Sequence, residues 1–258
     1  MTSAPKERPW WGLGDALLAI PFIIAMSVAG AVIGMIVAAL GTDSFSFSFD
    51  GDDLDDLSDP AMLPPALIVI SALAQQAGQA IWPWIVTKWK GISMAVDWRL
   101  RFKPIDLVIG IVVGGVGVVL ATLAATGMEA LIGLDDPSEA QNTDILTDAE
   151  GTPWLWAILA IVIIGAPISE ELLFRGLVLR AFENRWGPVV AIICSTIAFT
   201  LVHFTGAGFG ATLVLFSSIG LIGAILGIIT WRTDRLAPAI IAHVVFNVVG
   251  SIGALAAT

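Results

Sequence analysis

Residues Pro153–Phe182 read PWLWAILAIVIIGAPISEELLFRGLVLRAF. The run is mostly apolar and longer than the roughly 20 residues that cross a bilayer as a helix. Its second half nevertheless contains Glu170, Glu171 and Arg175. Ionisable side chains within a membrane span are energetically costly and usually mark a functional site. The stretch therefore predicts a long or tilted membrane helix that carries a polar site.

The composition of the whole chain is that of a membrane protein. Of the 258 residues, 57% are hydrophobic and 13% are charged, and the mean hydropathy is +0.90. Soluble globular proteins contain about 25% charged residues, and disordered and coiled-coil chains also need far more charge than this. These classes are therefore excluded, and we expect residues 1–258 to form a single membrane domain.

Seven apolar segments lie between charged or turn-rich breaks. They are Trp11–Leu40, Ala61–Val86, Ile105–Leu131, Pro153–Phe182, Pro188–Phe204, Phe209–Trp231 and Ala237–Ala257. Together they predict an all-α, polytopic bundle of seven transmembrane helices. Residues 11–131 would supply three N-terminal spans, and residues 153–257 would supply a four-span core with the polar motifs.

The loops between these segments alternate in charge. Loop 41–60 contains seven Asp and loop 132–152 contains six acidic residues, and neither contains a base. Eleven of the twelve basic residues fall on the other side, which predicts a cytoplasmic N-terminus and a C-terminus outside. The net charge of −10 is thus the sum of an acidic outer and a basic inner surface. We expect the lipid bilayer as a partner and no nucleic acid.

Small residues recur at four-residue spacing in three of the segments. Glycines at this spacing let two membrane helices approach closely, so we interpret the pairs as helix-packing sites. The pairs are Gly30 with Gly34, Gly110 with Gly114, and Gly223 with Gly227.

The two adjacent glutamates predict different roles for the two carboxylates. Glu171 and Arg175 are spaced i, i+4 and can pair on one face of a helix, which would keep Glu171 charged. Glu170 points about 100° away around the helix and is free to face a cavity as a general base. Pro167 removes a backbone donor one turn earlier, so we expect the helix to open or kink there.

The two histidines of the chain complete a set of polar groups on three predicted helices. Phe199 precedes His203 by one helical turn, and His243 precedes Asn247 by one turn. Two carboxylates, two imidazoles and a carboxamide suffice to activate a water and stabilise an oxyanion. They also suffice to bind a divalent metal, and a buried network that only holds helices together is a third interpretation.

The pattern Glu170-Glu171-x-x-x-Arg175, Phe199-x-x-x-His203 and His243-x-x-x-Asn247 resembles the signature of the CAAX protease and bacteriocin-processing (CPBP, or Abi) family. This family includes the type II CAAX prenyl endopeptidases. The resemblance covers about Pro153–Gly250 and implies an intramembrane endopeptidase that acts on peptide or membrane-protein substrates. It also favours the bacterial cytoplasmic membrane as the location.

The resemblance implies a role for each matching residue. Glu170 would activate the hydrolytic water with the help of His203. Glu171 would orient His203 or Arg175, and His243 with Asn247 would stabilise the oxyanion. Phe199 and Arg175 would support the site. The cofactor stays open between a metal-free glutamate mechanism and one divalent metal such as zinc, for which Glu170, His203 and His243 are the candidate ligands.

The depth of His203 tests this assignment. In a straight span it would lie about 15 residues, or roughly 22 Å, from the cytoplasmic end, deeper than Glu170. We therefore expect Pro188–Phe204 to begin inside the cytoplasm or to tilt.

Two other functions remain as alternatives. A non-catalytic scaffold or immunity-type membrane protein could retain the same residues for folding or partner binding. A transporter could use buried Glu and His as a proton relay, although no inverted repeat is visible and the polar residues cluster in the second half.

Overall fold

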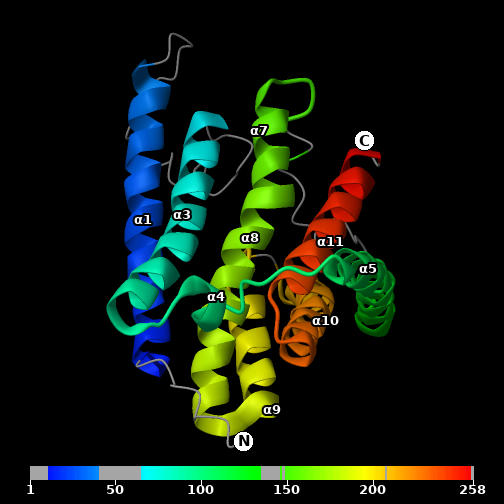
Figure 1. The fold of residues 1–258 in the computed structure, drawn as a ribbon. Coiled ribbons are helices and arrows are strands. Elements are labelled where there is room, and N and C mark those ends of the chain that lie inside the picture. The colour runs from blue at the N-terminus through cyan, green and yellow to red at the C-terminus, as the bar shows by residue number, and fades with distance from the viewer. Residues whose placement is uncertain (1–10, 41–64, 135–145, 147–148, 207, 257–258) are drawn as a thin grey trace, which may run out of the picture.

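The computed structural model describes residues 11–40, 65–134, 146, 149–206 and 208–256, and all regular elements within them are helical (Figure 1). The predicted all-α class is therefore confirmed. The elements are α1 (Leu13–Leu40), α3 (Pro65–Lys90), α4 (Met94–Asp97), α5 (Ile105–Ile132), α7 (Trp154–Ala160), η3 (Ile161–Gly165), α8 (Ala166–Glu171), η4 (Leu172–Val178), α9 (Leu179–Leu201), α10 (Phe209–Thr233) and α11 (Ala237–Ala256).

Five of the described helical stretches are long and apolar enough to cross a membrane: α1, α5, the run Trp154–Leu201, α10 and α11. The chain is thus an integral membrane protein. The helix α3 is not among the five, and the predicted segments Pro153–Phe182 and Pro188–Phe204 lie within one 48-residue helical run. The number of crossings and the orientation of the termini remain predictions.

The long run folds back on itself at Gly187. This residue has φ 80° and ψ 175°, a backbone conformation that is open to glycine and strained for other residues. The segments before and after it lie side by side as a hairpin, whose tip is at the bottom of Figure 1. The hydroxyl of Ser195 in the second arm donates to the carbonyl of Phe174 in the first, at 2.9 Å.

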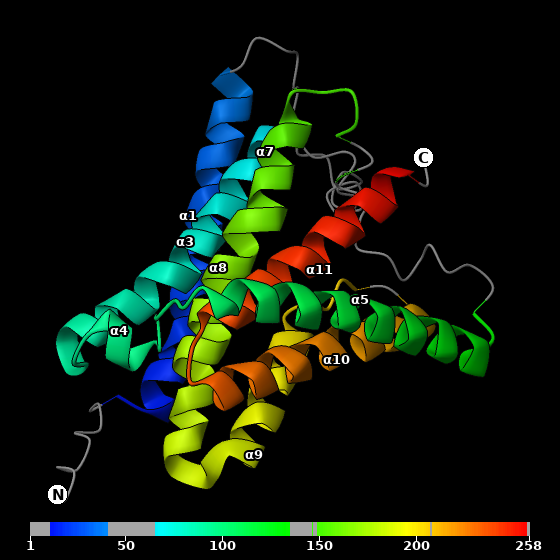
Figure 2. The same cartoon turned by 45° about the vertical axis from the view of Figure 1, so that its right-hand side comes forward.

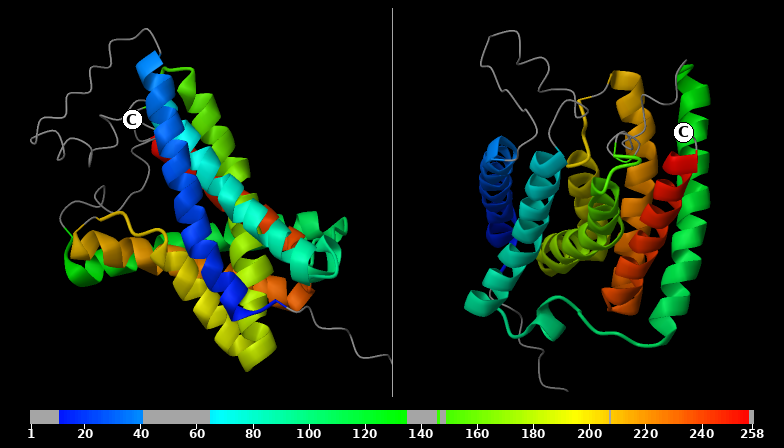
Figure 3. Two further views of the ribbon diagram at one scale, coloured as in Figure 1. Left: turned by 90° about the vertical axis from the view of Figure 1, so that its left-hand side faces the viewer. Right: turned by 90° about the horizontal axis from the view of Figure 1, so that it is seen from above.

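The other helices flank this hairpin on two sides. Figure 3 shows α1 and α3 on one side and α5, α10 and α11 on the other, and in Figure 2 the helix α5 lies along α10 and α11. A Cβ added at Gly30 would stand 2.4 Å from Ala74 of α3, and one added at Gly114 would stand 2.8 Å from the carbonyl oxygen of Ala242 in α11. The predicted packing role of these glycines is confirmed.

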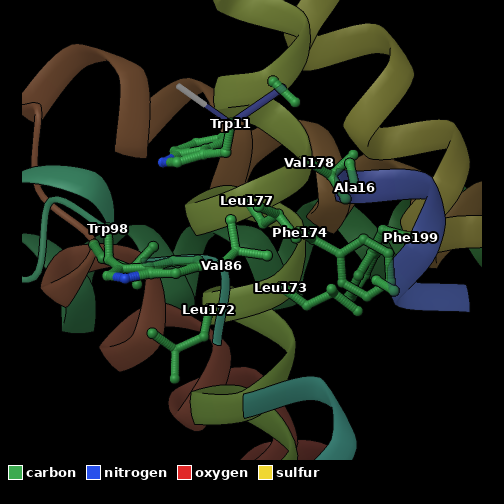
Figure 4. Close-up of a cluster of buried hydrophobic side chains, with 13 residues drawn as sticks. Trp11, Ala16, Val86, Trp98, Leu172, Leu173, Phe174, Leu177, Val178 and Phe199 are labelled. Carbon is green, nitrogen blue, oxygen red and sulfur yellow. The ribbon is translucent and has the colours of Figure 1, made fainter. Parts of the chain in front are cut away.

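A cluster of buried apolar side chains packs around η4 (Figure 4). Phe174 and Phe199 pack edge to face with ring centroids 5.3 Å apart. Trp98, from the segment between α3 and α5, stacks on Trp11 at 6.3 Å and donates its indole N–H to Thr87 at 2.6 Å. The α3–α5 connection is therefore built into the core.

Ion pairs fix the same connection to the ends of the other helices. Arg99 contacts Glu183 at 2.5 Å and Asp234 at 2.8 Å. Arg235 contacts the Asp106 carboxylate through Nε and Nη2, and these hydrogen bonds raise the pKa of the Arg235 guanidinium above its usual range. Asp106 lies in the first turn of α5.

Candidate active site

The helical segment before Glu170 has widened turns. Its backbone hydrogen bonds span five residues or involve side chains of other helices. In η3 the N–H of Ala166 donates to Ile161, five residues back, which is the π-helical pattern. Pro167 has no N–H to offer the next carbonyl, that of Val162. Asn247 of α11 takes its place and donates Nδ2 to Val162 O at 2.7 Å. The opening expected at Pro167 is therefore present and is sealed by a side chain.

The helix α3 supports the same segment from the opposite side. Gln76 donates Nε2 to the carbonyl of Ile161 at 3.3 Å, and Gln79 accepts a 3.0 Å hydrogen bond from the hydroxyl of Ser169. A Cβ at Gly165 would stand 2.2 Å from Gln76 Oε1, so the glycine leaves room for the amide. Sequence reasoning missed both glutamines, although polar amides in an otherwise apolar segment are a signal of interhelical hydrogen bonding.

Glu171 is fully buried and its Oε1 receives two partners. Arg175 donates Nη1 at 2.7 Å, which is the predicted i, i+4 pair. The Nδ1 atom of His243 lies 3.1 Å from the same oxygen. The resemblance implied that Glu171 orients His203 or Arg175. Glu171 contacts Arg175, and the imidazole beside it is that of His243.

Arg175 is itself fully buried and held on three sides. Besides Glu171, it donates Nη2 to the carbonyl of Gly223 at 2.9 Å, and its guanidinium lies 4.3 Å from the ring centroid of Phe199. A buried cation needs such partners because it has lost its hydration. The predicted supporting residues Arg175 and Phe199 are therefore in direct contact with each other.

Glu170 faces the Nε2 atoms of both histidines. Its Oε2 lies 3.8 Å from His243 Nε2 and 4.0 Å from His203 Nε2, and its side chain is 15% exposed. The Nδ1 atom of His203 donates to the carbonyl of Phe199 at 2.7 Å, since a carbonyl can only accept. Both rings are thus anchored through Nδ1, which leaves Nε2 toward the glutamate.

The hairpin explains how His203 reaches Glu170. Gly187 follows Glu170 by 17 residues and precedes His203 by 16. Because the two arms are almost equal in length, both residues lie at the same level of the bundle. The turn lies well beyond Glu170, at the tip of the long hairpin, so His203 does not lie deeper than Glu170. The expectation that Pro188–Phe204 begins inside the cytoplasm or tilts remains a prediction.

A pocket of about 590 Å³ opens next to these groups. Five of the predicted site residues line it, namely Glu170, Phe199, His203, His243 and Asn247. Glu171 and Arg175 lie behind the wall, where they contact the lining residues His243 and Phe199. The remaining lining is mostly aliphatic and comes from α3, η3, α8, α10 and α11, together with Leu146.

The spacing of Glu170, His203 and His243 bears on what the pocket could hold. Within the described ranges, no group of three or more His, Cys, Asp or Glu side chains is placed to hold a metal. Separations of 3.8 and 4.0 Å are too long for direct hydrogen bonds and leave room for a bridging group such as a water. The site therefore combines a carboxylate, two imidazoles and an amide that all line one pocket.

The part of the chain that resembles known proteins is the part that carries the three motifs. Residues 152–249 match the family model described as type II CAAX prenyl endopeptidase Rce1-like. The UPF0177 protein YbdI of Lactococcus lactis subsp. lactis is 30% identical over 106 residues, which are 41% of this chain and 50% of that relative. The chain thus spans about half the length of this curated relative. No solved structure matches the chain. The resemblance seen in the three motifs is confirmed, and residues 152–249 match the Rce1-like family of type II CAAX prenyl endopeptidases.

Proposed function

We propose that this protein is an intramembrane endopeptidase of the CPBP type in which Glu170 activates the hydrolytic water. The observation that carries the proposal is the convergence of Glu170 Oε2 with the Nε2 atoms of His203 and His243 at 3.8 to 4.0 Å. They converge at a pocket within a bundle of membrane-spanning helices. A carboxylate that is partly shielded and within reach of one water is the geometry that general-base catalysis needs.

In the proposed reaction, a water sits between Glu170 and His203. Glu170 accepts a proton from this water while the water oxygen bonds to the carbonyl carbon of the substrate. The resulting oxyanion accepts hydrogen bonds from His243 Nε2–H and from the second N–H of Asn247. Glu170 then returns the proton to the amine nitrogen as the C–N bond breaks.

Glu171 acts through His243. A carboxylate on Nδ1 fixes the orientation of an imidazole and stabilises the positive charge that the ring carries when Nε2 donates. Arg175 in turn keeps Glu171 ionised at a position without solvent, at 2.7 Å. We assign Glu171 and Arg175 as positioning residues and Glu170, His203, His243 and Asn247 as catalytic residues.

The substrate is a peptide or a membrane protein that reaches the pocket from the bilayer. We infer that α3 and the two arms of the Gly187 hairpin complete seven crossings. With the N-terminus cytoplasmic, the hairpin tip would lie on the cytoplasmic side of a bacterial membrane. The peptide library described below, with and without a farnesylated cysteine, tests whether the substrate bears a prenyl group.

The test uses the purified full-length chain in liposomes with a library of internally quenched peptides, half of which contain a farnesylated cysteine. Cleavage sites are identified by mass spectrometry. We expect Glu170→Gln to abolish cleavage and to leave the thermal midpoint unchanged. Glu129→Gln makes the same change on α5, away from the pocket, and should cleave normally. Undiminished cleavage by Glu170→Gln contradicts the proposal.

A non-catalytic scaffold is the second candidate, because the buried Glu171, Arg175 and His243 network also holds three helices together. In that case a cell that lacks this protein would be restored equally well by the Glu170→Gln variant and by the natural protein. Loss of the phenotype by a correctly folded Glu170→Gln variant favours the endopeptidase.

A further inference from the structure

The helix α11 presents three polar side chains to the pocket at four-residue intervals: His243, Asn247 and Ser251. The first two have partners, His243 in Glu171 and Asn247 in Val162. Ser251 is only 4% exposed, and its Oγ has no hydrogen-bond partner among the described residues. A buried hydroxyl without a partner is unfavourable, most of all in a membrane bundle, unless a ligand pairs with it.

The position of Ser251 along α11 sets its distance from the reacting groups. It lies eight residues beyond His243, which corresponds to about 12 Å of helix rise. An extended peptide covers roughly 3.3–3.6 Å per residue, so a substrate lying along α11 would reach Ser251 three to four residues from the cleaved bond. Near that end of the helix, Ala254 packs with Leu146 and Ile158 in an apolar cluster.

The chemistry of the lining defines what binds there. Among the described residues that line the pocket, only Glu170, His203 and His243 are titratable, and all three lie at the reacting end. The other polar side chains of the lining are uncharged: Gln75, Ser218, Asn247 and Ser251. A free carboxylate near Ser251 would be buried without a cation, whereas a main-chain amide would find a hydroxyl to pair with.

We propose that Ser251 is a substrate-positioning residue in a second subsite, where its hydroxyl hydrogen-bonds the main chain of a neutral peptide segment. The subsite favours an uncharged segment over a free C-terminal carboxylate. The identity of the bound molecule as a substrate rests on the proposed function, whereas the binding itself does not need cleavage.

The test measures binding to the Glu170→Gln protein, so that hydrolysis plays no part. The probe is a pool of fluorescent hexapeptides of Gly, Ala, Val, Leu and Phe that are acetylated and amidated, and binding is followed by fluorescence anisotropy in detergent micelles. We expect Ser251→Ala to weaken binding three- to tenfold, the loss expected for one hydrogen bond. Ser251→Thr, which keeps the hydroxyl, should restore most of it.

Two controls complete the test. Ser217→Ala removes a hydroxyl that bonds within α10, to Val214 at 2.7 Å, and should leave binding unchanged. The same peptide pool with free carboxylates should bind more weakly than the amidated pool. Three results would overturn the subsite. They are equal binding by the Glu170→Gln protein with and without Ser251→Ala, equal binding of the amidated and free-carboxylate pools, and no binding of either pool.

Failure here can be told apart from failure of the proposed function. If the amidated pool binds through Ser251 but the natural protein cleaves nothing, the subsite stands and the endopeptidase does not. Where cleavage is seen, Ser251→Ala should raise KM for peptides of six residues and leave kcat near the natural value. Peptides shortened to two residues on the side that reaches Ser251 should not respond to the change.

Discussion

The side-chain amide of Asn247 holds the carbonyl of Val162 at 2.7 Å. This carbonyl lies five residues before Pro167, the one position in η3 and α8 that has no N–H to donate. The residue that the family resemblance assigns to the oxyanion therefore also closes the backbone gap beside Glu170. The two roles are compatible, because an amide nitrogen carries two hydrogens.

Replacing Asn247 by Asp should therefore abolish catalysis and lower the stability of the fold. The carboxylate has the same shape but no N–H, so the buried Val162 carbonyl loses its donor, at a cost of about 1–3 kcal/mol. We expect a lower thermal midpoint together with loss of cleavage. An Asn247→Asp protein that unfolds at the natural temperature would show that the hydrogen bond to Val162 contributes little.

Arg175→Leu should be among the most destabilising substitutions. It leaves Glu171 buried without its cation, and breaking a buried pair from one side costs about 3–5 kcal/mol. The double variant Arg175→Leu with Glu171→Leu should lose less than Arg175→Leu alone, as measured by chemical unfolding in detergent. Lys90→Ala breaks the partly exposed pair with Asp15, at 2.6 Å, and should change stability by about 1 kcal/mol or less. Additive losses in the double variant would contradict this coupling.

Gly114→Ala and Gly115→Ala form a matched pair on α5. The new Cβ at 114 would stand 2.8 Å from the Ala242 carbonyl oxygen, whereas nothing lies within 4 Å of one at 115. We expect Gly114→Ala to destabilise the protein by about 1–3 kcal/mol through forced separation of α5 and α11. Gly115→Ala should be neutral or slightly stabilising because alanine favours helix. Thermal unfolding in detergent separates the two, and equal midpoints would argue against close packing at Gly114.

Cleavage should not depend on an added divalent metal. In the proposed mechanism one water bridges Glu170 and the two imidazoles, which lie 3.8 and 4.0 Å away, and no metal ion takes part. Activity should survive dialysis against a strong chelator, with no gain on adding zinc. Loss of cleavage in the chelator, followed by recovery with zinc, would establish Glu170, His203 and His243 as metal ligands instead.

The sequence predicts the helices and part of the site because both depend on local spacing. Long apolar runs locate the described helices to within a few residues, although the start of the predicted Ala61–Val86 segment lies outside the described residues. The i, i+4 rule predicts the pair of Glu171 and Arg175. The four-residue glycine spacing predicts helix-packing sites, which the structure places between α1 and α3 and between α5 and α11.

The parts that were not predicted depend on contacts between distant segments. The carbonyls of Ile161 and Val162 in η3 accept hydrogen bonds from Gln76 and Asn247, and no local pattern predicts where those donors lie. The choice of His243 over His203 by Glu171 follows from how α11 packs against α8. The fold-back at Gly187 was expected as a loop between two spans, but the lengths of its arms could be judged only once the turn was placed.

The lengths of the two arms of the Gly187 hairpin set the position of Glu170 relative to His203. One residue added to either arm would advance its far end by about 1.5 Å and rotate it by about 100°, which would turn Glu170 or His203 away from the other. One residue added to each arm would match the rise but leave both ends rotated, so only insertions close to whole helical turns in both arms would keep Glu170 and His203 facing each other. An insertion near the tip of the hairpin, far from the pocket, would therefore act on the two residues that line it.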